Sequence, residues 1–173
     1  MRKILIVIDM QNDFIDGSLG SPQAQAIVGN VINKIKQYRK EDIIATRDTH
    51  EEGYLNTMEG KHLPVVHCVR GTSGWQLNKS VDEALHGAML VDKPTFGSTV
   101  LTEYLRTLAS REQIEIELVG LCTDICVVSN ALLLKAAIPE IRISVDSSCC
   151  AGVTRESHEA ALVTMRSCQI EVI

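Results

Sequence analysis

The sequence predicts an α/β fold, namely a single-domain, three-layer α/β/α arrangement around a six-stranded, mainly parallel sheet. Short apolar stretches of strand length alternate along the chain with stretches of helical periodicity. This alternation is the pattern of a parallel sheet that carries helices on both faces. The chain has 173 residues, of which 45% are hydrophobic. That is enough for one sizeable core and too little for two ordinary domains, so we treat residues 1–173 as one domain.

The first predicted strand is the continuous apolar run from Lys3 to Asp9. Its aliphatic and β-branched residues indicate a central strand that is covered on both faces. A glycine-containing loop at residues 16–20 follows, and Ser21 with the proline after it is a plausible helix start. Apolar residues then recur at helical spacing as far as Tyr38, which predicts an amphipathic helix of four to five turns.

A second strand is predicted at residues 42–46, and a long polar loop runs from Arg47 to about Lys61. Loops of this length usually have a function. Helical patterns separate the last four predicted strands, which lie at residues 89–91, 115–119, 141–145 and 169–173.

Charge and composition exclude several classes of protein. The 17 basic and 22 acidic residues give a net charge of −5, and no basic run is present, so nucleic acid is not expected as a partner. No segment approaches the length of a membrane span, and the apolar run before Asp9 is too short for a signal peptide. We therefore expect a cytoplasmic protein with reduced thiols. Four of its six cysteines are assigned to packing, namely Cys68, Cys149, Cys150 and Cys168.

Reactive side chains follow the ends of the first four predicted strands. Asp9 ends the first strand, Asp48 and His50 follow the second, Lys93 follows the third, and a cysteine-containing turn at residues 120–126 follows the fourth. Open parallel sheets bind their ligands beyond the carboxyl ends of the strands. We therefore expect these groups to share one edge of the sheet.

The fourth predicted strand turns through Gly120 into a helix, which places a thiol near a helix N-terminus. The partial positive charge there favours a thiolate, and free N–H groups can bind an oxyanion. Cys122 and Cys126 both qualify, although burial is the commonest fate of a free cysteine, and their spacing fits zinc knuckles poorly. Convergence with Asp9 and Lys93 favours a nucleophile, because the carboxylate can take its proton and the ammonium can hold an ionised partner.

A second cluster of polar residues lies in and after the long loop. Asp48 and His50 are two positions apart, so in an extended segment they point the same way, and Glu59, His62 and His67 follow. Carboxylates and imidazoles suit zinc, manganese or iron, with water in open positions. Spacing alone also allows a solvated polar loop with scattered histidines.

Three motifs occur in order along the chain, namely Ile8-Asp9-Met10-Gln11-Asn12-Asp13-Phe14, Lys93-Pro94-Thr95-Phe96-Gly97-Ser98 and Gly120-Leu121-Cys122-Thr123-Asp124-Ile125-Cys126-Val127. With these motifs the chain resembles, over nearly its whole length, the isochorismatase-like cysteine hydrolases, most closely the nicotinamidases. The resemblance implies that Asp9 is the general base, Lys93 the lysine of a catalytic triad, and Cys126 the nucleophile. It also implies a cis peptide at Leu121–Cys122 and an oxyanion hole formed by the N–H groups of Cys122 and Cys126.

The resemblance further implies a divalent metal, zinc first, with manganese or iron as alternatives, and no organic cofactor. Asp48 and His50 match the family's metal-binding pair, and Glu59 and His67 are expected to complete the set, with His62 as a competitor. In the family this metal holds a pyridine nitrogen, which points to nicotinamide or a close analogue as the substrate, with nicotinate and ammonia as products.

One departure concerns the substrate pocket, because Pro64 stands where relatives often have an aromatic residue. Phe14, Phe96 or Trp75 is expected to flank the substrate instead, with Leu121 also in the pocket. One alternative is a related hydrolase of another small amide, a carbamoyl compound or an isochorismate-like substrate. The other is a non-catalytic metal-binding or redox-sensing protein, which the intact triad disfavours. The family also leads us to expect a homo-oligomer, a dimer or a tetramer.

Overall fold

The computed structural model describes residues 1–173 and contains one six-stranded sheet in the order β3-β2-β1-β4-β5-β6. Every neighbouring pair of strands is parallel. The predicted α/β fold is thus confirmed, and the sheet is parallel throughout. Its strands are β1 (Arg2–Ile8), β2 (Ile43–Asp48), β3 (Met89–Lys93), β4 (Ile114–Leu121), β5 (Ile143–Ala151) and β6 (Glu171–Val172).

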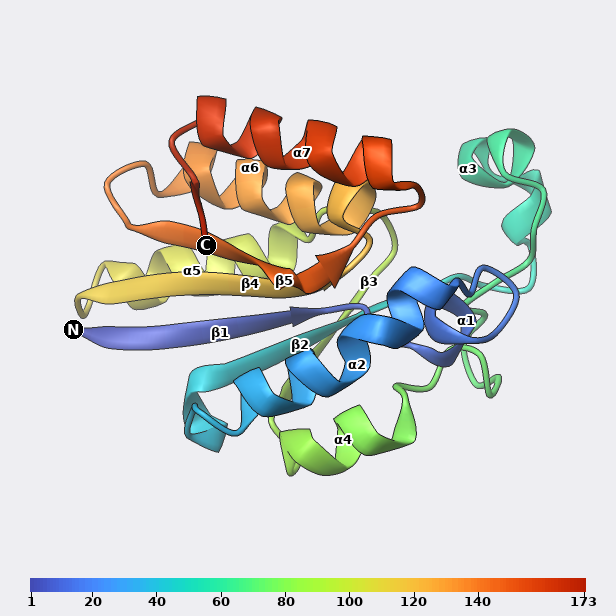
Figure 1. The fold of residues 1–173 in the computed structure, drawn as a ribbon, viewed down its shortest axis with the longest axis horizontal. Helices are drawn as coiled ribbons and strands as arrows, with labels where there is room; N and C mark the ends of the chain where they lie inside the picture. Colours follow the sequence, from blue (N-terminus) through green and yellow to red (C-terminus); the bar gives the residue numbers. More distant parts are fainter.

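Helices cover both faces of the sheet, as Figure 1 shows, with α2 and α4 on one side and α5, α6 and α7 on the other. None of the helices is long and apolar enough to cross a membrane. The helices are α1 (Asn12–Ile15), α2 (Pro22–Ile35), α3 (Met58–His62), α4 (Lys79–Leu85), α5 (Thr99–Ala109), α6 (Val128–Ala137) and α7 (Arg155–Ser167).

The central position of β1 follows from its uninterrupted apolar sequence. Ile4, Ile6 and Ile8 pack into the core under α5, α6 and α7, whereas Leu5 and Val7 pack into the core on the α2 and α4 side. All five side chains are buried. Successive residues of a strand face opposite sides of the sheet, so the uninterrupted apolar run lets β1 contribute to both cores along its length.

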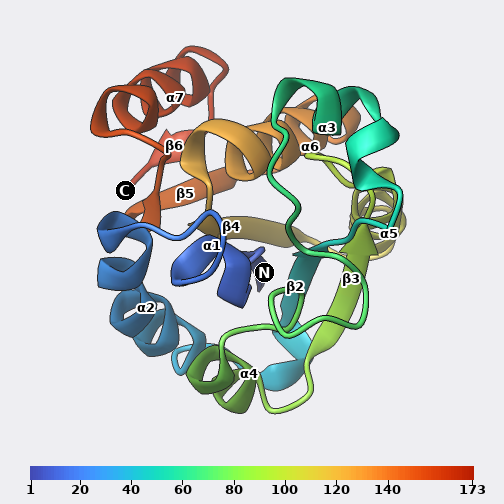
Figure 2. The same cartoon turned by 90° about the vertical axis from the view of Figure 1, so that its right-hand side faces the viewer.

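The region predicted as one polar loop contains regular structure and was in that respect wrongly predicted. A short 3₁₀ turn (Tyr54–Asn56) precedes α3, whose first turn is capped by Thr57. The Thr57 hydroxyl accepts a hydrogen bond from the Gly60 N–H at 3.0 Å. Figure 2 looks onto the edge where the strands end and shows α3 standing over it.

Two further predictions need correction. β5 begins two residues later than predicted and runs six residues further, to Ala151, because the serines at 147 and 148 continue the strand despite their polarity. Cys168 does not pack in the core, because α7 ends there and leaves it exposed, whereas Cys68, Cys149 and Cys150 are buried as expected.

Gly120 occupies the point where β4 passes closest to β1. Its φ is +117°, and an added Cβ would overlap the carbonyl of Ile8 on the neighbouring strand. We expect Gly120→Ala to lower the free energy of unfolding by at least about 2 kcal/mol, because both strain and overlap act there. Gly29→Ala is the matched control. It lies inside α2 with no neighbour within 4 Å, so it should raise stability by about 0.5–1 kcal/mol.

Urea unfolding of both glycine variants measures this difference. Equal effects of the two substitutions would contradict the close approach of β1 and β4 at Gly120.

Candidate active site

The carboxyl edge of the sheet brings together three side chains that were predicted to meet. Lys93, the last residue of β3, has its Nζ 2.6 Å from Asp9 Oδ2 and 3.4 Å from Cys126 Sγ. Asp9 follows the last residue of β1, and Cys126 lies in the turn after β4. All three side chains are at most 4% exposed. A carboxylate, an ammonium and a thiol therefore share one buried space.

Hydrogen bonds from the neighbouring strand hold Asp9 in place. The Thr46 hydroxyl donates to Asp9 Oδ1 at 2.6 Å, and the Asp9 N–H donates to the Thr46 carbonyl at 3.2 Å. Lys93 Nζ donates to the Thr95 carbonyl at 3.2 Å and lies 3.4 Å from Asp48 Oδ1. The ammonium thus faces two carboxylates and the thiol, and it balances the charge of the carboxylates in a buried site.

Burial and mutual charge set the resting protonation states. Burial opposes the charge of Lys93, but Asp9, Cys126 and Asp48 together outweigh it and raise the lysine's pKa. Burial and then the Asp9 carboxylate raise the pKa of Cys126 well above its ordinary value, against the effect of Lys93. The resting thiol therefore keeps its proton and needs a base. Burial and the Asp9 carboxylate thus oppose the ionisation that the helix terminus was expected to favour.

The turn that carries Cys126 begins at a cis peptide bond between Leu121 and Cys122, at the predicted position. A π-helical turn (Thr123–Val127) follows and leads directly into α6. The Cys122 carbonyl accepts hydrogen bonds from the N–H groups of Ile125 and Val127, at 3.1 and 3.0 Å. The Cys122 N–H donates to no group of the protein, so it is free to bind a ligand oxygen.

A four-residue cluster lies beside these groups and has the donors of a metal site. One ligand atom from each of Asp48, His50, Glu59 and His67 lies within 4.8 Å of the others. His50 Nε2 is 3.0 Å from Asp48 Oδ2, and His67 Nε2 is 3.8 Å from Glu59 Oε1. Two carboxylates and two imidazoles suit a borderline divalent ion such as zinc. The donor set therefore fits a metal.

The sequence offered His67 and His62 as alternative members of this cluster, and the structure distinguishes between them. His67 is buried, and its Nδ1 contacts the Val65 carbonyl at 2.8 Å, which leaves Nε2 directed at the cluster. His62 is exposed at the end of α3, and its Nδ1 contacts the Met58 carbonyl at 2.8 Å. Only His67 therefore joins the cluster.

Gln11 holds the backbone of Asp48, a role that the sequence did not reveal. Its side-chain oxygen accepts from the Asp48 N–H at 2.7 Å, and its amide donates to the Asp48 carbonyl at 2.8 Å and to the Trp75 carbonyl at 2.9 Å. Gln11 is fully buried. The sequence feature that could have indicated this role is the position of Gln11, two residues after Asp9 in the first motif.

A cavity of about 330 Å³ connects the thiol with the metal-type cluster, and its size suits a small ligand. Cys126, Asp48, Glu59 and His67 all reach it. Most of its lining is apolar, and no lysine or arginine contributes to it. Of the aromatic and apolar residues predicted for the pocket, the cavity is lined by Phe14, Phe96 and Leu121.

Trp75 does not line this cavity, contrary to expectation. Its indole N–H donates to the Thr49 hydroxyl at 2.9 Å, and the Arg47 guanidinium carbon lies 3.8 Å from the ring centroid. The ring is thus held by a cation–π contact away from the pocket. Leu63, the neighbour of Pro64, reaches the cavity instead.

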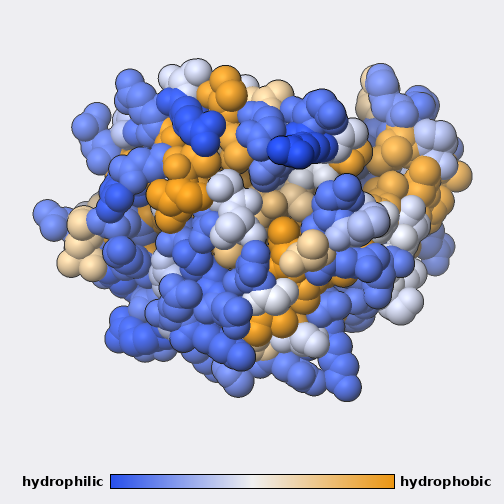
Figure 3. Space-filling model, viewed as in Figure 1, coloured by the Kyte–Doolittle hydropathy of each residue, from blue (hydrophilic) through white to orange (hydrophobic).

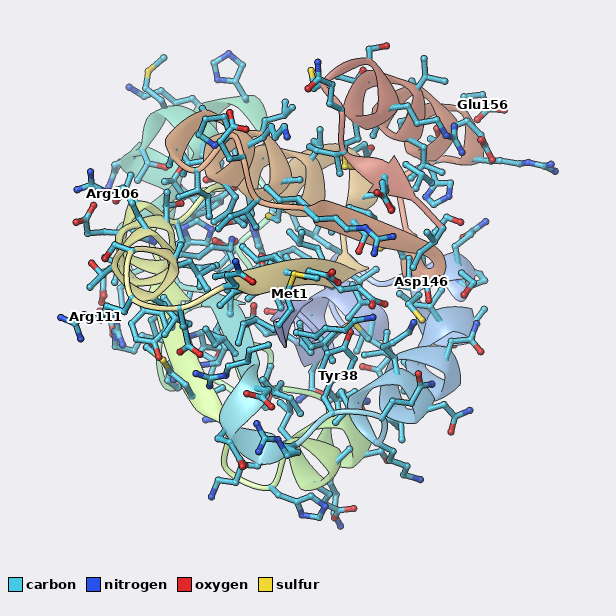
Figure 4. All side chains as sticks on the ribbon, turned by 90° about the vertical axis from the view of Figure 1, so that its left-hand side faces the viewer. Met1, Tyr38, Arg106, Arg111, Asp146 and Glu156 are labelled. Atoms are coloured by element: carbon cyan, nitrogen blue, oxygen red, sulfur yellow. The ribbon has the colours of Figure 1, made fainter.

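The opposite edge of the sheet carries a larger and more open groove of about 1100 Å³. Figure 4 looks onto this edge, with Met1 and Tyr38 labelled. Lys34 pairs there with Glu117 at 2.7 Å and with Asp146 at 2.8 Å, which ties α2 to the sheet. None of the reactive groups described above reaches this groove. The chemistry therefore belongs to the smaller cavity.

Comparison with known proteins identifies the family of this chain. The isochorismatase domain model matches residues 3–173. The isochorismatase family protein PncA of Bacillus subtilis is 30% identical over 174 residues, covering 94% of this chain and 93% of that protein. The nicotinamidase/pyrazinamidase of Mycobacterium tuberculosis is 28% identical over 190 residues, covering 99% and 98%.

Solved structures show the same likeness over the full chain. The nicotinamidase/pyrazinamidase PncA of Bacillus subtilis has a TM-score of 0.84 at 26% identity, covering 99% of each chain. The pyrazinamidase of Pyrococcus horikoshii in complex with zinc has a TM-score of 0.80 at 25% identity, covering 100% of this chain and 99% of that one. With a family match over residues 3–173 and a fold shared end to end, this chain belongs to the isochorismatase family.

Proposed function

We propose that this protein is a metal-dependent cysteine amidase that converts nicotinamide, or a close cyclic analogue, to the acid and ammonia. Its family and its nicotinamidase relatives make it a hydrolase that acts on an amide carbon–nitrogen bond. The observation that carries the finer proposal is the shared cavity, because Cys126 and three of the four metal-type residues open onto one space. Such an activity would return nicotinamide to the salvage of NAD.

The proposed reaction begins with transfer of the Cys126 proton to Asp9. The thiolate attacks the carboxamide carbon, and the N–H groups of Cys122 and Cys126 bind the oxyanion. Asp9 returns the proton to the departing ammonia, which leaves a thioester on Cys126. Asp9 then takes a proton from water as the water attacks the thioester, the bond between carbon and sulfur breaks to release the acid, and Asp9 returns the proton to the Cys126 thiolate. Lys93 remains an ammonium throughout and balances the charge of Asp9 and of the thiolate.

The metal would be held by Asp48, His50, Glu59 and His67. When bound, it supplies a Lewis acid that can hold a ring nitrogen of the substrate. The apolar walls and the lack of a basic side chain favour a neutral ring. A substrate carboxylate would find no lysine or arginine in the cavity wall, and this lack of a basic partner disfavours isochorismate-like compounds and anionic carbamoyl compounds.

Ammonia release from four compounds tests the proposal. Nicotinamide and pyrazinamide should be hydrolysed, whereas benzamide, which has the same shape as nicotinamide but no ring nitrogen, should show a kcat/KM lower by on the order of 10²-fold. N-carbamoylsarcosine, which carries a carboxylate, should not react. If benzamide were hydrolysed as fast as nicotinamide, the result would contradict a role of the metal in binding the substrate. A preference for N-carbamoylsarcosine would instead indicate a function like that of the related carbamoyl hydrolases.

Removal of the metal should abolish turnover and lower the melting temperature, because the ion binds the folded protein and relieves repulsion between the carboxylates of buried Asp48 and half-buried Glu59. Dialysis against a chelator, followed by separate addition of zinc, manganese or iron, measures both effects. His67→Ala should lose stoichiometric metal, and His62→Ala is the matched control that should keep it. Equal metal content of the two variants would contradict the proposed ligand set.

A further inference from the structure

Asn130 is a fully buried polar side chain on α6, in the helical turn that follows Cys126. Its Nδ2 donates to the Cys126 carbonyl at 2.8 Å and to the Phe96 carbonyl at 3.0 Å, and its Oδ1 accepts from the Ser98 N–H at 2.9 Å. Carbonyls only accept and an N–H only donates, so these partners fix the orientation of the amide. Every partner is a backbone group.

These partners lie in two pieces of the candidate site. One is the turn that carries Cys126. The other is the lysine loop, which we define as residues 94–98, between the last residue of β3 and the first of α5. Lys93 immediately precedes this loop, and its Nζ donates to the Thr95 carbonyl within it. Asn130 therefore connects the segment that positions the ammonium with the segment that positions the thiol.

The lysine loop also forms part of the pocket wall, because Phe96 lines the cavity. Close packing of the loop on α6 supports the connection. A Cβ added to Gly97 would lie 3.5 Å from the Leu133 side chain and 3.5 Å from the Ser129 carbonyl, which is ordinary contact distance. The loop therefore rests directly on the helix that carries Asn130, and its position depends on the hydrogen bonds that Asn130 makes.

We propose that Asn130 is a positioning residue of the amidase reaction, which clamps the lysine loop against the nucleophile turn and so fixes Lys93, Phe96 and Cys126 relative to one another. This inference rests on the function proposed above. A buried residue of purely structural value needs only satisfied hydrogen bonds, whereas all three bonds of Asn130 go to segments that carry a reactive group or a pocket wall. Displacement of such groups by about 1 Å costs on the order of 10²-fold in rate.

Asn130→Asp is the test variant, because it keeps the shape and the acceptor for Ser98 but turns two N–H···O bonds into contacts between oxygens. Thr102→Val is the matched control. The Thr102 hydroxyl donates to the Ser98 carbonyl at 2.8 Å, so this change removes a buried bond at the same loop without touching the three bonds of Asn130. Three quantities are measured for each variant, namely the melting temperature, kcat and KM for nicotinamide, and the rate of Cys126 alkylation by iodoacetamide.

The proposal predicts that Asn130→Asp lowers kcat/KM by on the order of 10²-fold and slows Cys126 alkylation by a similar factor. Thr102→Val should lower the melting temperature and leave both rates near wild type. Rates in folded Asn130→Asp that are no lower than those of Thr102→Val would overturn the proposal. If Asn130→Asp does not fold, Asn130→Ser, which keeps one hydroxyl, decides by the same criterion.

Alkylation needs no substrate, so it separates the two proposals. If the wild-type protein released no ammonia from any amide but the alkylation contrast persisted, the proposed function would fail and the positioning role of Asn130 for the thiol would stand.

Discussion

Cys126→Ala is expected to lower kcat/KM for nicotinamide by at least about 10³-fold, because Cys126 is the cavity thiol that lies beside Lys93 Nζ and is proposed to form the thioester. The loss should lie in kcat, since the metal-type residues and the apolar walls that bind the ring are unchanged. Removal of one buried sulfur leaves only a small space, so the melting temperature should change little. Ammonia release and metal content measured on one preparation check both statements.

Cys122→Ala is the matched control, because it removes the other thiol in the same cavity but keeps the backbone N–H proposed for the oxyanion hole. Its kcat/KM should stay within about tenfold of wild type. Mass spectrometry after rapid acid quench should detect an acyl adduct on Cys126 in wild type and in Cys122→Ala. An adduct on Cys122, or near-normal turnover by Cys126→Ala, would show that the nucleophile has been assigned to the wrong residue.

Replacing both members of the buried pair of Asp9 and Lys93 should restore much of the stability that either single substitution loses, but it should not restore activity. Asp9→Asn removes the proposed base and leaves the Lys93 ammonium with fewer partners, so we expect about 3–5 kcal/mol of lost stability and about 10²–10⁴-fold lower kcat. Lys93→Met removes the charge between two carboxylates and should destabilise the protein comparably. The double variant replaces the ion pair by neutral groups of similar size, so much of the lost stability should return.

Turnover should not return in the double variant, because neither a base nor a balancing charge remains. Urea unfolding and ammonia release on all four proteins complete the double-mutant cycle. Recovery of activity together with stability would mean that the pair only supports the fold and takes no part in the reaction.

The meeting of the reactive groups was predictable because parallel sheets have simple geometry. The apolar run of β1 and the alternation of strands with helices predicted that Asp9, Asp48 and Lys93 would lie at one edge, and they do. The choice between Cys122 and Cys126 was not predictable from spacing. It depends on which way the turn after β4 directs each side chain, and only Cys126 lies within 3.4 Å of Lys93 Nζ.

Other features depended on contacts that no sequence pattern encodes. The short helix α3 turns His62 outward, and Trp75 is held by Arg47 and the Thr49 hydroxyl instead of facing the pocket. Asn130 gave one weak signal, since it is a polar residue inside an otherwise largely apolar helix, but its three partners lie in a loop more than 30 residues earlier and in the preceding turn.

The segment between β2 and the buried His67 stands apart from the rest of the fold. Figure 1 shows α3 at a distance from the sheet, and Figure 3, in the same view, shows apolar residues at this end of the molecule. Leu55, Met58, Leu63 and Val66 are exposed there. Within residues 51–66, Glu59 and Leu63 reach the cavity.

One wall of the cavity therefore lies in a different stretch of the chain from Asp9, Lys93 and Cys126. An insertion, deletion or transplanted loop in residues 51–66 would reshape one wall of the cavity while leaving the sheet and the thiol in place. In evolutionary terms, we expect substitutions within residues 51–66 to be the first that give activity on new substrates. Directed evolution of this protein toward other amides should therefore begin with a library in residues 51–66.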